Sequence, residues 1–159
     1  MSRLAYQRQQ SLGAVLDIGC GEQNLNWLQA VRIDRMDYGI PGQLVGDAHA
    51  LPFKWKSFDT CILGDMLEHV ENPDRVLREA CRVARQLIVL TVPKDDRLPP
   101  GQHIAEARRL DAERIHPTIN FFTEQWLRRI FHPLPVRILD WQFVPECTWM
   151  NWLITLEML

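Results

Sequence analysis

The sequence lacks the features that mark several large classes of protein. Its 159 residues carry a net charge of −2, without the basic excess that is typical of nucleic-acid-binding domains. No apolar run approaches the ~20 residues that a membrane-spanning helix needs. The first ten residues are too polar for a signal peptide. We therefore expect no nucleic-acid partner, no membrane span and a cytoplasmic location.

Cysteine is also scarce, and the spacing of the cysteines argues against a cysteine metal site and against a redox pair. The four cysteines are Cys20, Cys61, Cys81 and Cys147, and no two are spaced as a metal-binding or redox pair. Isolated cysteines are typical of a reducing compartment. Hydrophobic residues make up 47% of the chain, which suits one folded domain over residues 1–159.

What the sequence does contain is an alternation of short apolar runs and helical patterns. Strands are predicted over residues 14–18, 30–34, 43–45, 58–63, 86–92, 136–144 and 148–156. Helices are predicted over residues 2–10, 22–29, 73–85, 104–115 and from Thr123 onward. Strands alternating with helices predict an α/β sandwich with a mostly parallel sheet.

A glycine turn follows the first predicted strand. Gly19 and Gly21 let the backbone turn sharply there, and they leave room for a ligand to approach. The next two strands each end at a carboxylate, Asp34 and Asp47, and Asp17 precedes the glycines. A strand, a glycine turn and a helix start form a site for a nucleotide-like ligand at the carboxyl edge of a parallel sheet.

Four motifs together make the sequence resemble the class I S-adenosylmethionine-dependent methyltransferases, in particular the type 11 family. They are the glycine motif at 15–21, the Gly-Asp-Ala-x-x-Leu-Pro-Phe segment at 46–53, Ser-Phe-Asp at 57–59 and Leu-Glu-His-Val-x-x-Pro at 67–73. Their order and spacing match as well. The sequence departs from the family pattern at Gln23, where a third glycine is usual, and it lacks a Pro-Gly-Gly loop before the fifth strand.

The resemblance implies a Rossmann-like three-layer sandwich with a seven-stranded sheet whose last strand is antiparallel. It also implies that S-adenosyl-L-methionine is the cofactor and S-adenosyl-L-homocysteine its product. Asp17 would hold the methionine ammonium, Asp34 the ribose hydroxyls (with Asp37 as its rival) and Asp47 the adenine amino group. The full set of expected cofactor residues is Asp17, Gly19, Cys20, Gly21, Asp34, Arg35, Asp47, Ala48, Gly64 and Asp65.

Two histidines are candidates for a general base, because an imidazole titrates near neutrality. His103 and His116 lie in the stretch after the fifth strand, and residues 94–122 are predicted to form a cap on the acceptor side. A surface role for either histidine stays open. Asp65, Glu68 and His69 resemble a metal-binding group of some methyltransferases, but we favour a structural role for them and expect no metal.

The predicted function is transfer of a methyl group to an O or N atom of a small-molecule, sugar or lipid-linked acceptor. The alternative is a non-catalytic, cofactor-binding subunit of a larger methyltransferase complex. A homodimer and a partner subunit both stay open. Trp141, Trp149 and Trp152 near the end of the chain fit core packing, an acceptor pocket or a dimer surface. A nicotinamide-dependent dehydrogenase is disfavoured, since Glu22 and its neighbours stand where that fingerprint has a further glycine.

Overall fold

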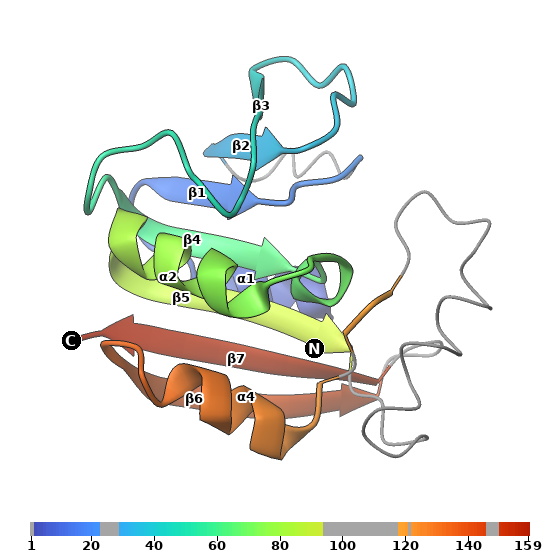
Figure 1. Cartoon of the computed structure of the whole chain (residues 1–159), viewed down its shortest axis with the longest axis vertical. Coiled ribbons are helices and arrows are strands. Elements are labelled where there is room, and N and C mark those ends of the chain that lie inside the picture. The colour runs from blue at the N-terminus through green and yellow to red at the C-terminus, as the bar shows by residue number, and fades with distance from the viewer. Residues whose placement is uncertain (1, 23–28, 94–117, 121, 146–149) are drawn as a thin grey trace.

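The computed structural model describes residues 2–22, 29–93, 118–120, 122–145 and 150–159. In these residues seven strands form one sheet in the order β3-β2-β1-β4-β5-β7-β6 (Figure 1). The strands are β1 (Val15–Ile18), β2 (Ala30–Asp34), β3 (Gln43–Val45), β4 (Phe58–Gly64), β5 (Ala84–Pro93), β6 (Val136–Pro145) and β7 (Met150–Met158). Only β7 runs antiparallel to its neighbours β5 and β6. The predicted mostly parallel sheet with an antiparallel last strand is confirmed.

Helices cover both faces of the sheet, which gives three layers (Figure 1). Helix α1 (Arg3–Gln10) lies on one face, and α2 (Pro73–Val83) and α4 (Glu124–Phe131) lie on the other. A short 3-10 helix, η1 (Leu67–His69), follows β4. None of the helices in the described ranges is long and apolar enough to span a membrane.

Each face of the sheet has its own apolar core. The larger core lies under α2 and α4, and the smaller one lies under α1 around Tyr6, Val15, Ile62, Val89 and Leu153. Alternation along the strands explains the division, since successive side chains point to opposite faces. The α/β sandwich predicted from the sequence therefore has central strands buried on both faces, which can hold groups rigidly at their ends.

The helices begin where the sequence predicts capping residues. The Asn72 side chain accepts a hydrogen bond of 3.0 Å from the Arg75 amide at the start of α2. Thr123 accepts one of 3.1 Å from the Trp126 amide at the start of α4. Such bonds satisfy amides that the first turn of a helix leaves without intrahelical partners.

The boundary between α2 and β5 differs from the prediction. The helix ends at Val83 rather than near residue 85, and the strand begins at Ala84 rather than at residue 86. Ala84 pairs with Phe58 at the start of β4, so sheet pairing draws residues 84 and 85 into the strand. Pairing also extends the last strand, which was predicted to end at residue 156, to Met158, because β6 pairs with it through Met158. The helices predicted over 22–29 and 104–115 fall largely or wholly outside the described residues.

Candidate functional site

The glycine turn after β1 is bonded to the end of β2. The Gly19 amide donates to the Ile33 carbonyl at 2.8 Å, and the Gly21 amide donates to Asp34 Oδ2 at 2.9 Å. Both glycines have positive φ angles, +72° and +57°, which side-chain-bearing residues adopt only with strain. The two sequence features that predicted a ligand site, the glycines and Asp34, thus lie side by side.

The two glycines face different surroundings. A Cβ added at Gly19 would lie 2.8 Å from the Met66 Cβ, so this glycine is needed for packing against the segment after β4. A Cβ added at Gly21 would meet no atom of the described part of the chain within 4 Å. The open space beside the turn therefore lies at Gly21.

Asp17 is a buried carboxylate next to this turn. Its side chain lies in β1 at 3% exposure, and its Oδ2 atom has no hydrogen-bond partner among the residues that the structure describes. Burial raises the pKa of the Asp17 carboxyl from 3.8 to about 6, while the nearby Arg32 charge lowers it and the Asp34 charge raises it. A buried oxygen without a donor costs free energy, so Asp17 is suited to a cationic ligand group that supplies one.

Asp34 and its rival Asp37 differ in their placement. Asp34 ends β2, where its Oδ1 accepts from the Met36 amide at 3.0 Å while Oδ2 faces the glycine turn. Asp37 is exposed in the following loop and accepts from the Gly39 amide at 2.8 Å. The structure therefore brings Asp34 to the glycine turn, whereas Asp37 shapes its own loop.

Cys20 lies between the glycines and is buried. Burial raises the pKa of the Cys20 thiol to about 12, and the charges of Asp17 and Asp34 add to the rise. The thiol is therefore neutral at physiological pH and packs as a small apolar group.

The segment that follows β3 carries two of the predicted cofactor residues, Asp47 and Ala48. Asp47 is exposed, and its Oδ1 accepts from the His49 amide at 2.9 Å and lies 2.7 Å from His49 Nδ1. The hydrogen bond from the His49 amide lowers the pKa of the Asp47 carboxyl, with a smaller contribution from the Arg35 charge. Ala48 packs against the larger core. Asp47 is thus an ionised hydrogen-bond acceptor on a loop, and the next residue, Ala48, anchors that loop to the core.

Helix α2 fixes this loop through contacts that sequence reasoning missed. Arg82 donates to the Phe53 carbonyl at 2.7 Å and to the Leu51 carbonyl at 2.9 Å, while its Nε donates to Glu79. Glu79 Oε2 in turn accepts from the Leu51 amide at 2.8 Å. Arg75, one turn earlier, donates to the His49 carbonyl at 2.9 Å.

The helical spacing of these three charged residues was visible in the sequence. Arg75, Glu79 and Arg82 stand at positions i, i+4 and i+7 of α2, so they share one face of the helix. A charged helix face usually lies in solvent. This face contacts the 47–53 loop instead, and the sequence does not show where that loop lies. Leu51, in the loop that this face of the helix holds, is buried.

Gly64 ends β4 at the carboxyl edge, and Asp65 follows it. Asp65 has a positive φ of +50°, and its carboxylate binds the Arg3 guanidinium of α1 and accepts from Thr91 Oγ1 at 2.7 Å. Its amide donates to the Thr91 carbonyl at 3.0 Å. Asp65 therefore joins α1 to β5, and its carboxylate is already held by protein groups.

Glu68 and His69 do not form a metal site with Asp65. Among the residues that the structure describes, no three His, Cys, Asp or Glu side chains are grouped to hold a metal ion. Glu68 is buried, and burial raises the pKa of its carboxyl to about 8. His69 Nε2 lies 3.9 Å from Glu68 Oε1. Glu68 instead packs in the segment after β4, where its carbonyl accepts from the Ile119 and Asn120 amides.

The acceptor side is only partly described. His103 and His116 lie outside the described residues, as does most of the predicted 94–122 cap. Of the three tryptophans, Trp141 and Trp152 pack edge-to-face with ring centroids 5.5 Å apart. The ring centroid of Phe131 in α4 lies 6.1 Å from that of Trp141, on the same side of the sheet. This arrangement supports core packing for Trp141 and Trp152, and Trp149 lies outside the described residues.

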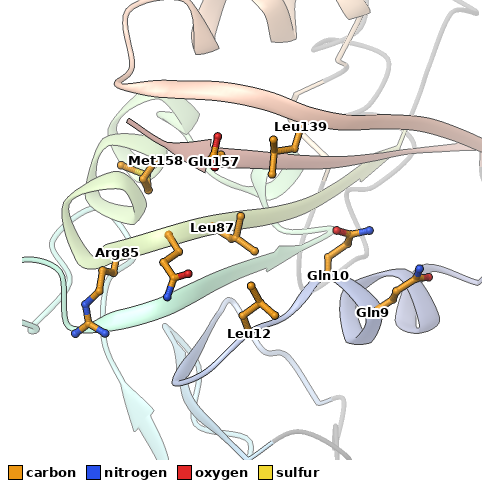
Figure 2. A pocket seen from close by; sticks show the side chains of 9 residues that line it. Gln9, Gln10, Leu12, Arg85, Leu87, Leu139, Glu157 and Met158 are labelled. Carbon is orange, nitrogen blue, oxygen red and sulfur yellow. The ribbon is translucent and has the colours of Figure 1, made fainter.

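One open cavity lies far from the glycine turn. It has a volume of about 430 Å³ and lies between the end of α1 and the amino-terminal end of β5 (Figure 2). Leu12, Leu87 and Leu139 line it together with Arg85 and Glu157. Asp59 also lies at this edge, where its Oδ2 accepts from the Ala14 amide at 2.9 Å. Ligand binding in open α/β sheets takes place at the opposite, carboxyl edge.

Comparisons with known proteins agree with the geometry. The type 11 family model described as "Methyltransferase domain" matches residues 16–88, slightly less than half of the chain. Nothing among the curated proteins matches the chain.

Solved structures match over almost the whole chain. A S-adenosylmethionine-dependent methyltransferase from Methanosarcina mazei is 17% identical, with a TM-score of 0.77 over 100% of this chain and 98% of that one. Magnesium protoporphyrin IX methyltransferase from Synechocystis, solved with bound S-adenosylhomocysteine, is 14% identical, with a TM-score of 0.69 over 98% and 80%. A Haloferax volcanii chain in complex with a methyltransferase activator is 14% identical, with a TM-score of 0.72 over 97% and 86%. Residues 16–88 thus match the methyltransferase domain model, and the chain has the fold of S-adenosylmethionine-dependent methyltransferases.

Proposed function

We propose that the protein binds S-adenosyl-L-methionine at the carboxyl edge of β1, β2 and β4 and transfers its methyl group to an acceptor. The observation that carries the proposal is the buried Asp17 oxygen, which has no donor in the described ranges of the chain, next to the open space at Gly21. The family match over residues 16–88 and the fold support the same function.

The residues around the glycine turn fit the chemical groups of this cofactor. Asp17 matches an ammonium, because a buried carboxylate gains most from a charged donor. Asp34 offers carboxylate oxygens for vicinal hydroxyls beside the turn, and Asp47 is an ionised acceptor suited to an amino group. Gly21 lets the ligand lie against the backbone. S-adenosylmethionine supplies a methyl group on an already activated sulfonium, so the protein has mainly to position the reactants.

The acceptor is an O or N atom of a small molecule, a sugar or a lipid-linked compound. His103 or His116 would remove its proton, and residues 94–122 would cap it. These assignments come from the sequence alone. An activated methyl donor needs a base only when the acceptor is weakly acidic or protonated. The cofactor half of the fold is therefore compatible with a small-molecule, a sugar or a lipid-linked acceptor.

A second candidate is a cofactor-binding subunit that works with a partner chain. The neighbour from Haloferax volcanii that is bound to a methyltransferase activator favours this alternative. Copurification with a partner, together with cofactor binding in the absence of turnover by the chain alone, would distinguish it from a self-sufficient enzyme.

The test of the proposed function is calorimetric titration of S-adenosylhomocysteine into the parent protein and into Asp17→Asn. We expect the variant to bind ten- to a hundredfold more weakly, because a charge-assisted hydrogen bond to the ammonium is worth about 1.5–3 kcal/mol. In the parent, affinity should fall as the pH drops below about 6, where Asp17 becomes protonated.

A stability measurement serves as the control for folding. The pKa of Asp17 is higher in the folded state than its unperturbed value of 3.8, so folding takes up a proton between about pH 4 and pH 6. Stability therefore falls as the pH rises through this window. Asp17→Asn removes the buried charge and should be more stable than the parent by about 1–3 kcal/mol at pH 7, with no gain at pH 4. Unchanged ligand affinity in this folded variant would contradict the proposed role of Asp17, and a parent that binds NAD but not S-adenosylhomocysteine would contradict the function.

A further inference from the structure

One glutamine of α1 is buried, although the helix is mostly polar. Gln7 has an exposed fraction of 2%, whereas Gln9, two residues later, is exposed. A buried amide is costly unless it has a polar function, because it must give up its hydrogen bonds to water. The position of Gln7 therefore calls for a role that the apolar docking of α1 does not supply.

Gln7 occupies the space that a side chain at Gly64 would fill. A Cβ built at Gly64 would lie 2.6 Å from Gln7 Nε2, so the amide lies directly over the last residue of β4. Only a glycine at position 64 lets the amide approach the carboxyl edge of the sheet this closely.

Gln7 and Asp17 border the same face of the sheet at this edge. Ile62 pairs with Asp17 and belongs to the core under α1. Because side chains alternate along a strand, position 64 faces the same side as Ile62, one step closer to the carboxyl edge. The Gln7 amide therefore lies on the Asp17 side of the sheet, between that carboxylate and the ligand edge.

The rest of α1 is fastened in a way that fixes this amide. Arg3 forms an ion pair with Asp65, which is also bonded to Thr91 at 2.7 Å. Tyr6 Oη lies 2.7 Å from Thr155 Oγ1 in the core. The bonds from Arg3 to the residue after β4 and from Tyr6 to β7 leave the helix little freedom to shift, so the amide is held in place before a ligand binds.

We propose that Gln7 binds the amino-acid end of the cofactor, with its amide N–H donating to the methionyl carboxylate while Asp17 accepts from the ammonium. An α-amino acid group presents one anion and two or three donors, and the pair of Gln7 and Asp17 presents the complementary donor and acceptor. The inference rests on the proposed function. It assigns to α1 a ligand contact that sequence motifs do not reveal.

The test compares two ligands, S-adenosylhomocysteine and its decarboxylated analogue, in the parent and in Gln7→Leu. In the parent, loss of the carboxylate should weaken binding at least tenfold. In Gln7→Leu, S-adenosylhomocysteine should bind about tenfold more weakly than to the parent, and the two ligands should differ much less. Gln7→Glu places an anion against the carboxylate and should weaken S-adenosylhomocysteine further, while its affinity for the decarboxylated analogue changes little. Gln9→Leu, on the exposed side of the same helix, is the matched control and should leave both affinities unchanged.

The possible outcomes separate the inference from the function on which it rests. A parent that fails to bind S-adenosylhomocysteine overturns the proposed function. A parent that binds it, with variants at Gln7 that keep the parent's ratio between the two ligands, overturns the inference alone. Equal weakening of both ligands in a variant also overturns it, because that result indicates a packing role. The melting transition shows whether Gln7→Leu folds. If it does not, the role of Gln7 is decided by Gln7→Glu, whose ratio of affinities for the two ligands is compared with that of the parent.

Discussion

The two halves of the sheet are built in different ways. On the predicted cofactor side, β1, β2 and β3 have only four, five and three residues, and no helix is described over residues 35–57. On the other side β4, β5, β6 and β7 have seven to ten residues each, with helices packed on both faces. Val45 in β3 is 61% exposed, whereas Leu90 and Ile154 are completely buried.

The difference shows where stability and binding reside. The long strands and their helices bury most of the apolar surface, so this half supplies most of the free energy of folding. The short strands end in the glycine turn and in loops that polar contacts hold, such as those from Arg82 and Glu79. Loops positioned by a rigid scaffold are common sites of binding. The loops at the ends of the short strands are therefore the part of the molecule placed to bind a ligand.

The largest expected effect is in the core of the long-strand half. Leu90→Ala should lower the free energy of unfolding by about 2–5 kcal/mol, the range for removing a buried leucine side chain and leaving a cavity. Denaturant unfolding followed by tryptophan fluorescence measures the change. A loss below about 1 kcal/mol would show that this half does not carry the stability assigned to it.

An intermediate effect is expected where α2 holds the cofactor loop. Arg82→Ala removes two hydrogen bonds to carbonyls and the partner of Glu79, and should lower stability by about 1–2 kcal/mol. Hydrogen exchange should accelerate at the Leu51 amide and remain slow in β5. Arg82→Lys is the matched control and should restore only part of the loss, because lysine lacks the planar fork that reaches both carbonyls. Uniform acceleration across the whole sheet would mean that the loop and the core unfold together.

How much of this could be predicted depends on the range of the contacts involved. Strands 30–34 and 43–45 were predicted at both ends, because turn residues and the carboxylate at Asp34 bound them locally. The end of α2 was missed, because only the pairing of Ala84 with Phe58 decides it. Gln7 and Arg82 gave no local indication of their roles, since their partners lie 57 and about 30 residues away.

Within the candidate site, the same reasoning separates Asp34 from Asp65. Asp34 could be predicted from its place at the end of a strand, and the structure brings it to the glycine turn. Asp65 also follows a strand, but its carboxylate binds Arg3, which is 62 residues away in sequence. Position at a strand end predicts that a side chain reaches the carboxyl edge, whereas tertiary contacts decide whether that side chain is available to a ligand.

The smallest expected effect tests whether the face of β3 is truly exposed. Val45→Thr keeps the β-branched shape that suits a strand, and at 61% exposure the new hydroxyl can reach water, so stability should change by less than about 0.5 kcal/mol. The same change at Val89, which is completely buried in β5, should cost about 1–3 kcal/mol, because its hydroxyl would be buried. Both variants are measured by the same denaturant unfolding. Val45→Thr could instead lower stability as much as the change at Val89, with a loss that becomes smaller when the protein is diluted. That result would mean that a second copy of the chain covers β3 in solution. The cofactor half would then owe part of its stability to an interface, and the contrast between the two halves would hold only for the isolated chain.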